Sequence, residues 1–325
     1  MGSQDIAPAL TTEKMLLDIL LIVIGVVLVI WGADRMTDGA VSIAQRLKIP
    51  KIVIGLTIVA MGTSAPEFFV SLMSALKGTP DLAVGNVVGS NIFNTLLIVG
   101  VAAMVAPIVI SRSTVRKDMP WSMLAAVMLT MLCFDQVISR WDALVFFILF
   151  CTFIGYNLRE ARKGKQQPEE EEEKGMKPIL AVGLVLLGLG CLVLGSNVFV
   201  DSATRVAQQL GVSEAVIGLT IVAGGTSLPE LATSVVAARK GQSAIAIGNV
   251  IGSNVFNVLM IIGITGLVKP MNIVGITNVD LGVMTGGMVL LWLFSYTKFK
   301  VERWEGAVLT GIFAGYMCWL LSQVI

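Results

Sequence analysis

The chain has 325 residues, of which 55% are hydrophobic and 14% are charged, and its formal net charge is +1. Soluble domains carry about 25% charged residues, so this composition excludes an ordinary soluble protein and indicates a protein of the lipid bilayer. A net charge so close to zero gives no reason to expect a nucleic-acid partner. The chain contains no histidine, which excludes the HExxH metalloprotease motif and any histidine proton relay.

Long apolar blocks follow one another along the chain. A membrane-spanning helix needs about 20 mostly apolar residues. We therefore expect an all-α membrane protein with ten spans, at residues 16–44, 52–76, 82–106, 120–135, 141–158, 178–209, 215–238, 244–268, 278–295 and 305–324. The unusual length of the first and sixth spans indicates helices that extend beyond the bilayer. The expected divisions are a polar segment 1–15, a first repeat 16–158, a charged linker 159–177 and a second repeat 178–325.

The number of spans per half has a topological consequence. Five is odd, so the two halves insert in opposite orientations and form an inverted repeat. With the N-terminus outside, the internal loops carry 17 Lys and Arg residues and the external segments carry 4. This bias follows the positive-inside rule, so we expect both termini on the extracytoplasmic side of the cell inner membrane. The acidic run Glu169–Glu173 in the linker is expected to be a solvated segment.

The same polar motif occurs twice, 163 residues apart. Gly-Thr-Ser-x-Pro-Glu ends at Glu67 and again at Glu230, and Gly-Asn-x-x-Gly-Ser-Asn-x-x-Asn ends at Asn94 and again at Asn257. Each glutamate lies inside an apolar span, where a charged residue is expensive and usually functional. Two such acids at equivalent positions predict a cation site at the interface of the repeats.

A polar stripe at helical spacing accompanies each glutamate. Residues 60, 63, 64, 67, 71 and 74 read Ala, Thr, Ser, Glu, Ser and Ser, and the second copy repeats most of this stripe. Proline has no N–H, so Pro66 and Pro229 break their helices and leave the carbonyls of Gly62 and Gly225 without helical partners. Carboxylate, hydroxyl, amide and freed carbonyl oxygens together suit hard cations such as Ca²⁺ and Na⁺.

Two parts of the downstream motif have a structural interpretation. We expect Asn91 and Asn254 to form interhelical hydrogen bonds rather than to bind ions. Glycines four residues apart favour close helix packing, and they occur in both copies, at Gly85 and Gly89 and at Gly248 and Gly252.

These duplicated motifs resemble the alpha repeats of the Ca²⁺/cation antiporter superfamily, and the chain is most similar to its prokaryotic sodium/calcium exchanger type. The resemblance implies a transporter rather than an enzyme, with Na⁺ and Ca²⁺ as transported substrates, no cofactor, and Glu67 and Glu230 shared between the two ions. We expect it to work as a monomer in the bilayer.

The resemblance also implies a set of oxygen ligands around the two acids. These are backbone oxygens of Thr63 and Thr226 around Ca²⁺, the Ala60 carbonyl with Ser64 and Ser253 at an inner Na⁺ position, the Ala223 carbonyl with Ser90 and Ser227 at an outer one, and Asn94 and Asn257 in the middle. Some relatives carry aspartate at one of the last two positions. This chain has asparagine at both, so its site has two fixed carboxylates instead of three.

Other functions stay open. A Ca²⁺/H⁺ antiporter would protonate Glu67 and Glu230 instead of binding Na⁺, although the surrounding Ser and Thr oxygens favour Na⁺ because a proton needs no cage. A cation channel builds its acid rings from symmetric oligomers, whereas these acids come from two halves of one chain. An intramembrane enzyme could use two carboxylates as acid and base, but the chain offers no histidine to ligate a metal.

Overall fold

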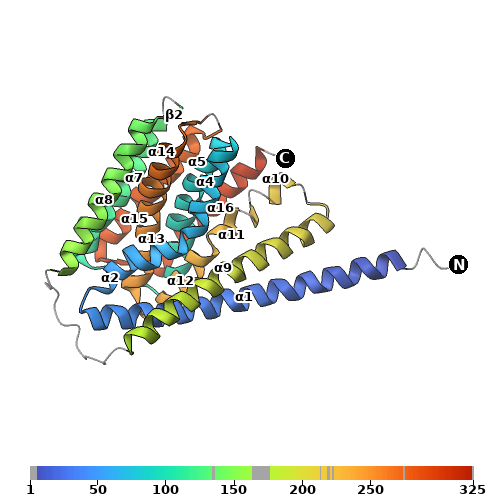
Figure 1. Cartoon of the computed structure of the whole chain (residues 1–325), viewed down its shortest axis with the longest axis horizontal. Helices are drawn as coiled ribbons and strands as arrows, with labels where there is room; N and C mark the ends of the chain where they lie inside the picture. The colour runs from blue at the N-terminus through green and yellow to red at the C-terminus, as the bar shows by residue number, and fades with distance from the viewer. Residues whose placement is uncertain are drawn as a thin grey trace.

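The computed structural model describes residues 6–133, 136–162, 176–212, 214–217, 220–221, 223–273 and 275–323. Within these ranges the chain is almost entirely helical (Figure 1). The acidic run predicted at Glu169–Glu173 and the first five residues of the predicted N-terminal segment lie outside them.

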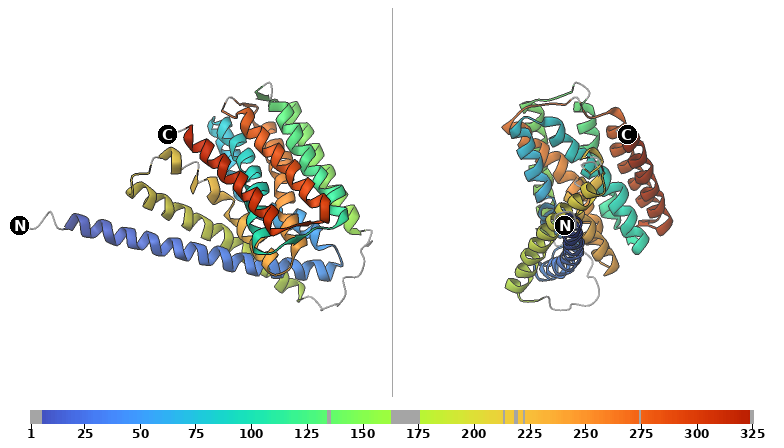
Figure 2. Two further views of the ribbon diagram at one scale, coloured as in Figure 1. Left: turned by 180° about the vertical axis from the view of Figure 1, so that it is seen from behind. Right: turned by 90° about the vertical axis from the view of Figure 1, so that its right-hand side faces the viewer.

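Two long helices, α1 (Ile6–Leu47) and α9 (Pro178–Gln209), pack lengthwise against each other along one side of the bundle (Figures 1 and 2). They have 42 and 32 residues, which confirms the prediction that the first and sixth spans are unusually long. Glycines allow the close contact, because a Cβ added at Gly188 would lie 2.6 Å from the Gly32 carbonyl oxygen and one at Gly25 would lie 2.8 Å from the Gly195 carbonyl oxygen. A shift of 163 residues converts one of these contacts into the other, so each repeat supplies the same surface.

The motif-bearing segments form interrupted helices at the centre of the bundle. Their parts in the first half are α2 (Lys51–Ile54), η1 (Gly55–Val59), α3 (Ala60–Thr63), α4 (Ala65–Lys77), α5 (Pro80–Ile92), η2 (Phe93–Ile98) and α6 (Val99–Val105), where η marks π-helical turns. Their parts in the second half are α10 (Glu214–Ile217), α11 (Ala223–Thr226), α12 (Leu228–Arg239), α13 (Ser243–Val255), η6 (Phe256–Ile262) and α14 (Gly263–Val268).

The remaining helices lie around this centre. They are η3 (Thr114–Asp118) leading into α7 (Met119–Leu132), α8 (Arg140–Arg162), α15 (Asn278–Lys298) and α16 (Arg303–Ser322). Burial follows this arrangement. In the apolar windows of α5–α6 and α13–α14, 72% and 94% of the residues are buried, against 17% in the window of α16. Apolar side chains exposed on the outer helices face the lipid of a bilayer protein.

Two small sheets connect distant loops. They pair β1 (Ile108–Val109) with β4 (Lys300–Val301), and β2 (Val137–Ile138) with β3 (Met271–Asn272), both antiparallel. The register places Ile108 opposite Val301 and Ile138 opposite Met271. A shift of 163 residues turns the first pair into the second, so the two halves contribute to both sheets in the same way.

Seven helices in the described ranges are long and apolar enough to cross a membrane, or eight if α2–α3 and α4 count as one bent span. The chain is therefore a multi-pass membrane protein. The expected fourth span is represented by α7, which has 14 residues, and the expected seventh span contains residues 218, 219 and 222, which lie outside the description. The total of ten spans stays a prediction.

Candidate cation-binding site

Both motif helices are interrupted immediately before the glutamate. In the first half α3 ends at Thr63 and α4 begins at Ala65, with a bend of 47°. Ser64, at the break, has φ −84° and ψ 8°. Ser227 has nearly the same conformation in the second half, with φ −92° and ψ 6°. Pro66 follows the first break within the first turn of α4, where its missing N–H leaves no helical bond unmade.

The breaks place Glu67 in the first turn of α4 and Glu230 in the first turn of α12. The unpaired N–H groups and the dipole of a helix N-terminus favour a negative charge at this position. Each glutamate is only 1% exposed, and burying a charged carboxylate is costly unless a positive partner offsets the charge. The local structure therefore supports two buried carboxylates that need a positive partner.

Each carboxylate is contacted by a serine of the other repeat. Ser64 Oγ donates to Glu230 Oε1 at 2.8 Å, and Ser227 Oγ donates to Glu67 Oε1 at 3.2 Å. The two contacts are equivalent under the shift of 163 residues. Ser227 Oγ also lies 3.4 Å from Ser90 Oγ. The two copies of the motif thus form one site at the interface of the halves.

Oxygen acceptors without partners gather on these same elements. Helix α4, which carries Glu67, packs against η6, which carries Asn257. Helix α12, which carries Glu230, packs against η2, which carries Asn94. Among the described residues, the buried side-chain oxygens with no hydrogen-bond partner include Glu67 Oε2, Glu230 Oε2, Asn94 Oδ1, Asn257 Oδ1 and Ser253 Oγ. Burying carboxylate and amide oxygens unpaired is costly. An all-oxygen cluster of this kind suits a hard cation.

The other predicted ligands have more constrained surroundings. Thr63 Oγ1 donates to Asn249 Oδ1 at 3.1 Å, so its side chain is engaged across the repeat interface. The Ala60 carbonyl accepts from the Ser64 N–H at 3.0 Å and lies 3.3 Å from Thr63 Oγ1. Ala223 lies in α11, and its side chain is outside the description. Thr226 is half-buried at the end of α11.

Asparagines that the sequence interpretation left out of the site position its helices. Asn86 Nδ2 donates to the Glu67 carbonyl at 3.2 Å, and Asn249 Nδ2 donates to the Glu230 carbonyl at 3.3 Å. Both bonds tie the backbone of a glutamate to the next helix. Their signal in the sequence is the identical spacing of 19 residues from each glutamate to its asparagine.

The carbonyl expected to be freed by Pro229 has a partner from a long helix. Ser196 Oγ on α9 donates to the Gly225 carbonyl at 2.5 Å. The equivalent residue on α1 is Ala33, which has no hydroxyl to donate to Gly62. The side chain of Leu189 on α9 lies against Gly62 instead, since a Cβ added at Gly62 would be 2.6 Å from Leu189 Cδ2. The two helix breaks therefore contact the long helices differently.

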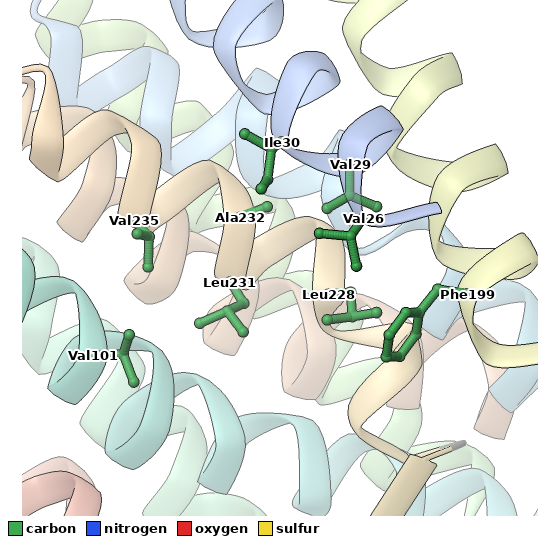
Figure 3. Close-up of a pocket in the computed structure, with 9 residues that line it drawn as sticks. All are labelled: Val26, Val29, Ile30, Val101, Phe199, Leu228, Leu231, Ala232 and Val235. Atoms are coloured by element: carbon green, nitrogen blue, oxygen red, sulfur yellow. The ribbon is translucent and has the colours of Figure 1, made fainter. Parts of the chain in front are cut away.

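A cavity of about 270 Å³ lies beside the site, between α1, α6, α9 and α12 (Figure 3). Every side chain that lines it is apolar, including Val29 on α1, Phe199 on α9 and Leu231 on α12. It has no group to hold a cation and is not part of the site. Its place shows that α12 is two-sided, with Glu230 on its polar face and Leu231 on its apolar face.

Ion pairs join α1 to the end of α12. Lys240 Nζ lies 2.6 Å from both Asp34 Oδ1 and Asp38 Oδ1. The repeat equivalents of Lys240 and Asp38 are Lys77 and Asp201. In the part of the chain that the structure describes, neither of these two forms an ion pair. No group of three or more Asp, Glu, Cys or His residues suited to a metal occurs there either, so any cation site depends on neutral oxygens beside two acids.

Comparisons with known proteins agree with this geometry. The family model described as "Sodium/calcium exchanger protein" matches residues 17–159 and 180–322. The chain is 38% identical to the "Putative antiporter CaxA" of Alkalimonas amylolytica, over 95% of this chain and 100% of that protein. It is 35% identical to the "Inner membrane protein YrbG" of Escherichia coli, over 94% and 96% of the two chains.

Two further comparisons match proteins named as sodium/calcium exchangers. It is 31% identical to the "Sodium/calcium exchanger MaX1" of Methanosarcina acetivorans, over 92% of this chain and 97% of that one. A solved structure of the sodium-calcium exchanger NCX_Mj superposes with a TM-score of 0.82 at 28% identity, over 93% of this chain and 98% of that chain. The chain therefore belongs to the sodium/calcium exchanger protein family, and it is a membrane-embedded cation antiporter of the prokaryotic type within the Ca²⁺/cation antiporter superfamily.

Proposed function

We propose that the chain exchanges Na⁺ for Ca²⁺ across the membrane by alternating access, with Glu67 and Glu230 shared between the two ions. The observation that carries this proposal is the reciprocal pair of contacts, Ser64 to Glu230 and Ser227 to Glu67. Each contact leaves the second carboxylate oxygen without a partner. Two carboxylates neutralise one Ca²⁺ or two Na⁺, so the ions compete for the same charge.

The neutral oxygens supply the rest of the proposed shell. Ser253 Oγ and the amide oxygens of Asn94 and Asn257 support ligand roles because they are buried and unpartnered. We assign the remaining roles by family resemblance, with Ca²⁺ held by backbone oxygens of Thr63 and Thr226, inner Na⁺ by Ala60, Ser64 and Ser253, and outer Na⁺ by Ala223, Ser90 and Ser227.

The proposed topology is ten spans in two inverted halves, 16–158 and 178–325, with both termini outside. Three observations support it. The family model matches two stretches that start 163 residues apart, the strand pairs β1–β4 and β2–β3 exchange under the same shift, and positive residues concentrate in the loops assigned to the inside. The relative named as an inner membrane protein supports the same location for this chain. Because one chain supplies both halves of the site, a monomer suffices for exchange.

Alternating access requires that one side of the site be closed while the other is open. α1 packs along α12, and Lys240 joins them by ion pairs with Asp34 and Asp38. The repeat-equivalent contact between α9 and α4 is not extensive, and Lys77 forms no ion pair with Asp201 among the described residues. This asymmetry supports a state in which the cytoplasmic side is closed.

The decisive experiment is ⁴⁵Ca²⁺ flux in proteoliposomes, with Na⁺, K⁺ and pH gradients imposed separately. We expect a Na⁺ gradient to drive uptake, and Glu67→Gln or Glu230→Gln to abolish it. Glu305→Gln is a matched control, because Glu305 is also buried, at 3% exposure, but caps α16 through a bond to the Glu302 N–H. Uptake driven by the pH gradient alone would identify a Ca²⁺/H⁺ antiporter. Normal Na⁺-dependent flux in Glu67→Gln or in Glu230→Gln would overturn the proposed site.

A further inference from the structure

Four buried asparagine side chains form two cross-repeat pairs behind the two glutamates. Asn94 Nδ2 donates to Asn254 Oδ1 at 3.1 Å, and Asn257 Nδ2 donates to Asn91 Oδ1 at 3.3 Å. A shift of 163 residues turns one pair into the other. All four residues are at most 4% exposed. In each pair the residue of the proposed shell is the donor, so its oxygen remains free.

Asn91 and Asn254, the partners of the proposed ligands, make further hydrogen bonds of their own. Asn91 Nδ2 lies 4.0 Å from Met284 Sδ, and a thioether can only accept. This contact favours the orientation in which Asn91 presents its oxygen, and not its NH₂, to Asn257. On the other side Asn254 Nδ2 donates to Thr95 Oγ1 at 2.8 Å. A hydroxyl can donate as well as accept, so Thr95 anchors the Asn254 amide without fixing its direction, whereas the thioether of Met284 favours one direction for Asn91. Both chains of bonds end at a free amide oxygen at the site.

The direction of these bonds matters because the two ends of an asparagine amide, the oxygen and the NH₂ group, have nearly the same shape and opposite hydrogen-bonding properties. The oxygen is an acceptor and attracts a cation, whereas the NH₂ group is a donor and repels it. A carboxylate has no such ambiguity. Since this chain has asparagine at both middle positions and only two fixed acids, its neutral oxygens help a cation only if both amides are turned the right way. Turned the other way, an NH₂ group could donate to the unpartnered oxygens of Glu67 and Glu230 and block the site.

We propose that Asn91 and Asn254 are positioning residues, which hold the amides of Asn257 and Asn94 with their oxygens toward the bound cation. Met284 sets the direction of the Asn91 chain, and Thr95 anchors the Asn254 chain. This inference rests on the proposed cation site, and it adds that the polarity of the two middle ligands is fixed by residues that do not touch the ion.

The test is a set of double-mutant cycles in which Asn257 or Asn94 is replaced by aspartate. Both side-chain oxygens of aspartate are acceptors, so its orientation no longer matters. Asn91→Leu removes the acceptor for Asn257 at similar volume. We expect it to raise the half-saturating Ca²⁺ concentration about 10- to 100-fold, because a hydrogen bond from the flipped amide to a carboxylate must break before the cation binds. In an Asn257→Asp background we expect less than about a threefold effect, because aspartate offers acceptors in both orientations.

The crossed combinations serve as matched controls. Asn94→Asp should leave the effect of Asn91→Leu on the half-saturating Ca²⁺ concentration intact. The corresponding effect of Asn254→Leu should be suppressed by Asn94→Asp, but not by Asn257→Asp. Equal losses in all backgrounds would show that Asn91 and Asn254 only fill space, and would overturn the proposal. A failure of the proposed cation site can be distinguished from a failure of this positioning role, because Glu67→Gln would retain normal flux only in the first case.

A second measurement leaves the site untouched. Met284→Leu removes the acceptor at the start of one chain and should raise the half-saturating Ca²⁺ concentration several-fold, with little change in maximal flux. Met288→Leu is the control, because Met288 accepts from Ser122 at 3.4 Å and does not bond to Asn91. Identical behaviour of these two variants would overturn the directing role of Met284, even if Asn257→Asp proved inactive.

Discussion

The contact between α1 and α9 predicts a severe effect for a single added methyl group. In Gly188→Ala the new Cβ would lie 2.6 Å from the Gly32 carbonyl oxygen and 2.7 Å from the backbone N of Met36. Ordinary contacts begin near 3.4 Å, so the helices must separate by about 0.8 Å to restore them. Backbone atoms cannot rotate away as a flexible side chain can. Overpacking of this kind costs about 1–3 kcal/mol.

The matched control is Gly190→Ala, two residues along the same helix. Its added Cβ would have no atom within 4 Å, so it retains only the gain in helix propensity of alanine over glycine, about 1 kcal/mol. The difference between the two variants therefore isolates the steric cost. Thermal unfolding of the purified proteins in detergent, followed by the loss of monodisperse protein, measures that difference.

We expect Gly188→Ala to unfold several degrees below Gly190→Ala. The repeat-equivalent change, Gly25→Ala, should behave like Gly188→Ala, because its Cβ would lie 2.8 Å from the Gly195 carbonyl oxygen. Equal unfolding midpoints for Gly188→Ala and Gly190→Ala would refute the close approach of the two long helices.

Three other changes test separate contacts. Ser196→Ala should lower stability by about 1–3 kcal/mol, because it leaves the buried Gly225 carbonyl unpaired, and an unchanged unfolding midpoint would contradict this. Lys240→Met should change stability by less than about 1 kcal/mol, because its ion pairs are partly exposed, yet it should alter the flux rate. Ser64→Ala should weaken Na⁺ binding at least tenfold, measured as the Na⁺ concentration that half-displaces bound ⁴⁵Ca²⁺, since it removes both a proposed Na⁺ ligand and the bond to Glu230.

The central part of the site could be predicted because its signal is local and duplicated. The spacing from Glu67 to Asn94 recurs from Glu230 to Asn257, and helical periodicity then places the polar residues on one face. The interhelical bonds predicted for Asn91 and Asn254 are confirmed, with Asn257 and Asn94 as their partners. What the sequence did not reveal was the direction of these bonds, which for Asn91 depends on the thioether of Met284, a residue distant in the sequence.

Close packing through the paired glycines is confirmed in one copy of the motif. An added Cβ at Gly252 would lie 2.7 Å from the Leu56 carbonyl oxygen, and one at Gly248 would lie 3.0 Å from the Ile52 carbonyl oxygen. The residue equivalent to Leu56 is Leu219, which lies outside the described residues. Close packing at Gly89 therefore stays a prediction, whereas an added Cβ at Gly85 would make only an ordinary contact of 3.5 Å with Ile276.

Contacts that differ between the repeats could not be predicted from the duplication. Ser196 caps the Gly225 carbonyl, but its equivalent is Ala33, so no repeated signal marks the bond. Such bonds join elements that are distant in sequence, and only the packing of α9 against α11 brings them together. Repetition identifies what the halves share, and the structure is needed for what distinguishes them.

Those differences bear on the proposed alternating access, in which the chain would adopt two access states. In an inverted repeat, a shift of 163 residues describes the opposite state, in which Lys77 would pair with Asp201 as Lys240 now pairs with Asp38. The two closures are unequal, however. Lys240 contacts a second carboxylate, Asp34, whereas the residue equivalent to Asp34 is an asparagine. In the proposed cycle one closure would therefore hold its lysine with two acids, which also pair with Arg35, and the other with one. We infer that unequal closures of this kind favour one access state in the absence of ions, and that bound cations shift the balance only through their differential affinity for the two states.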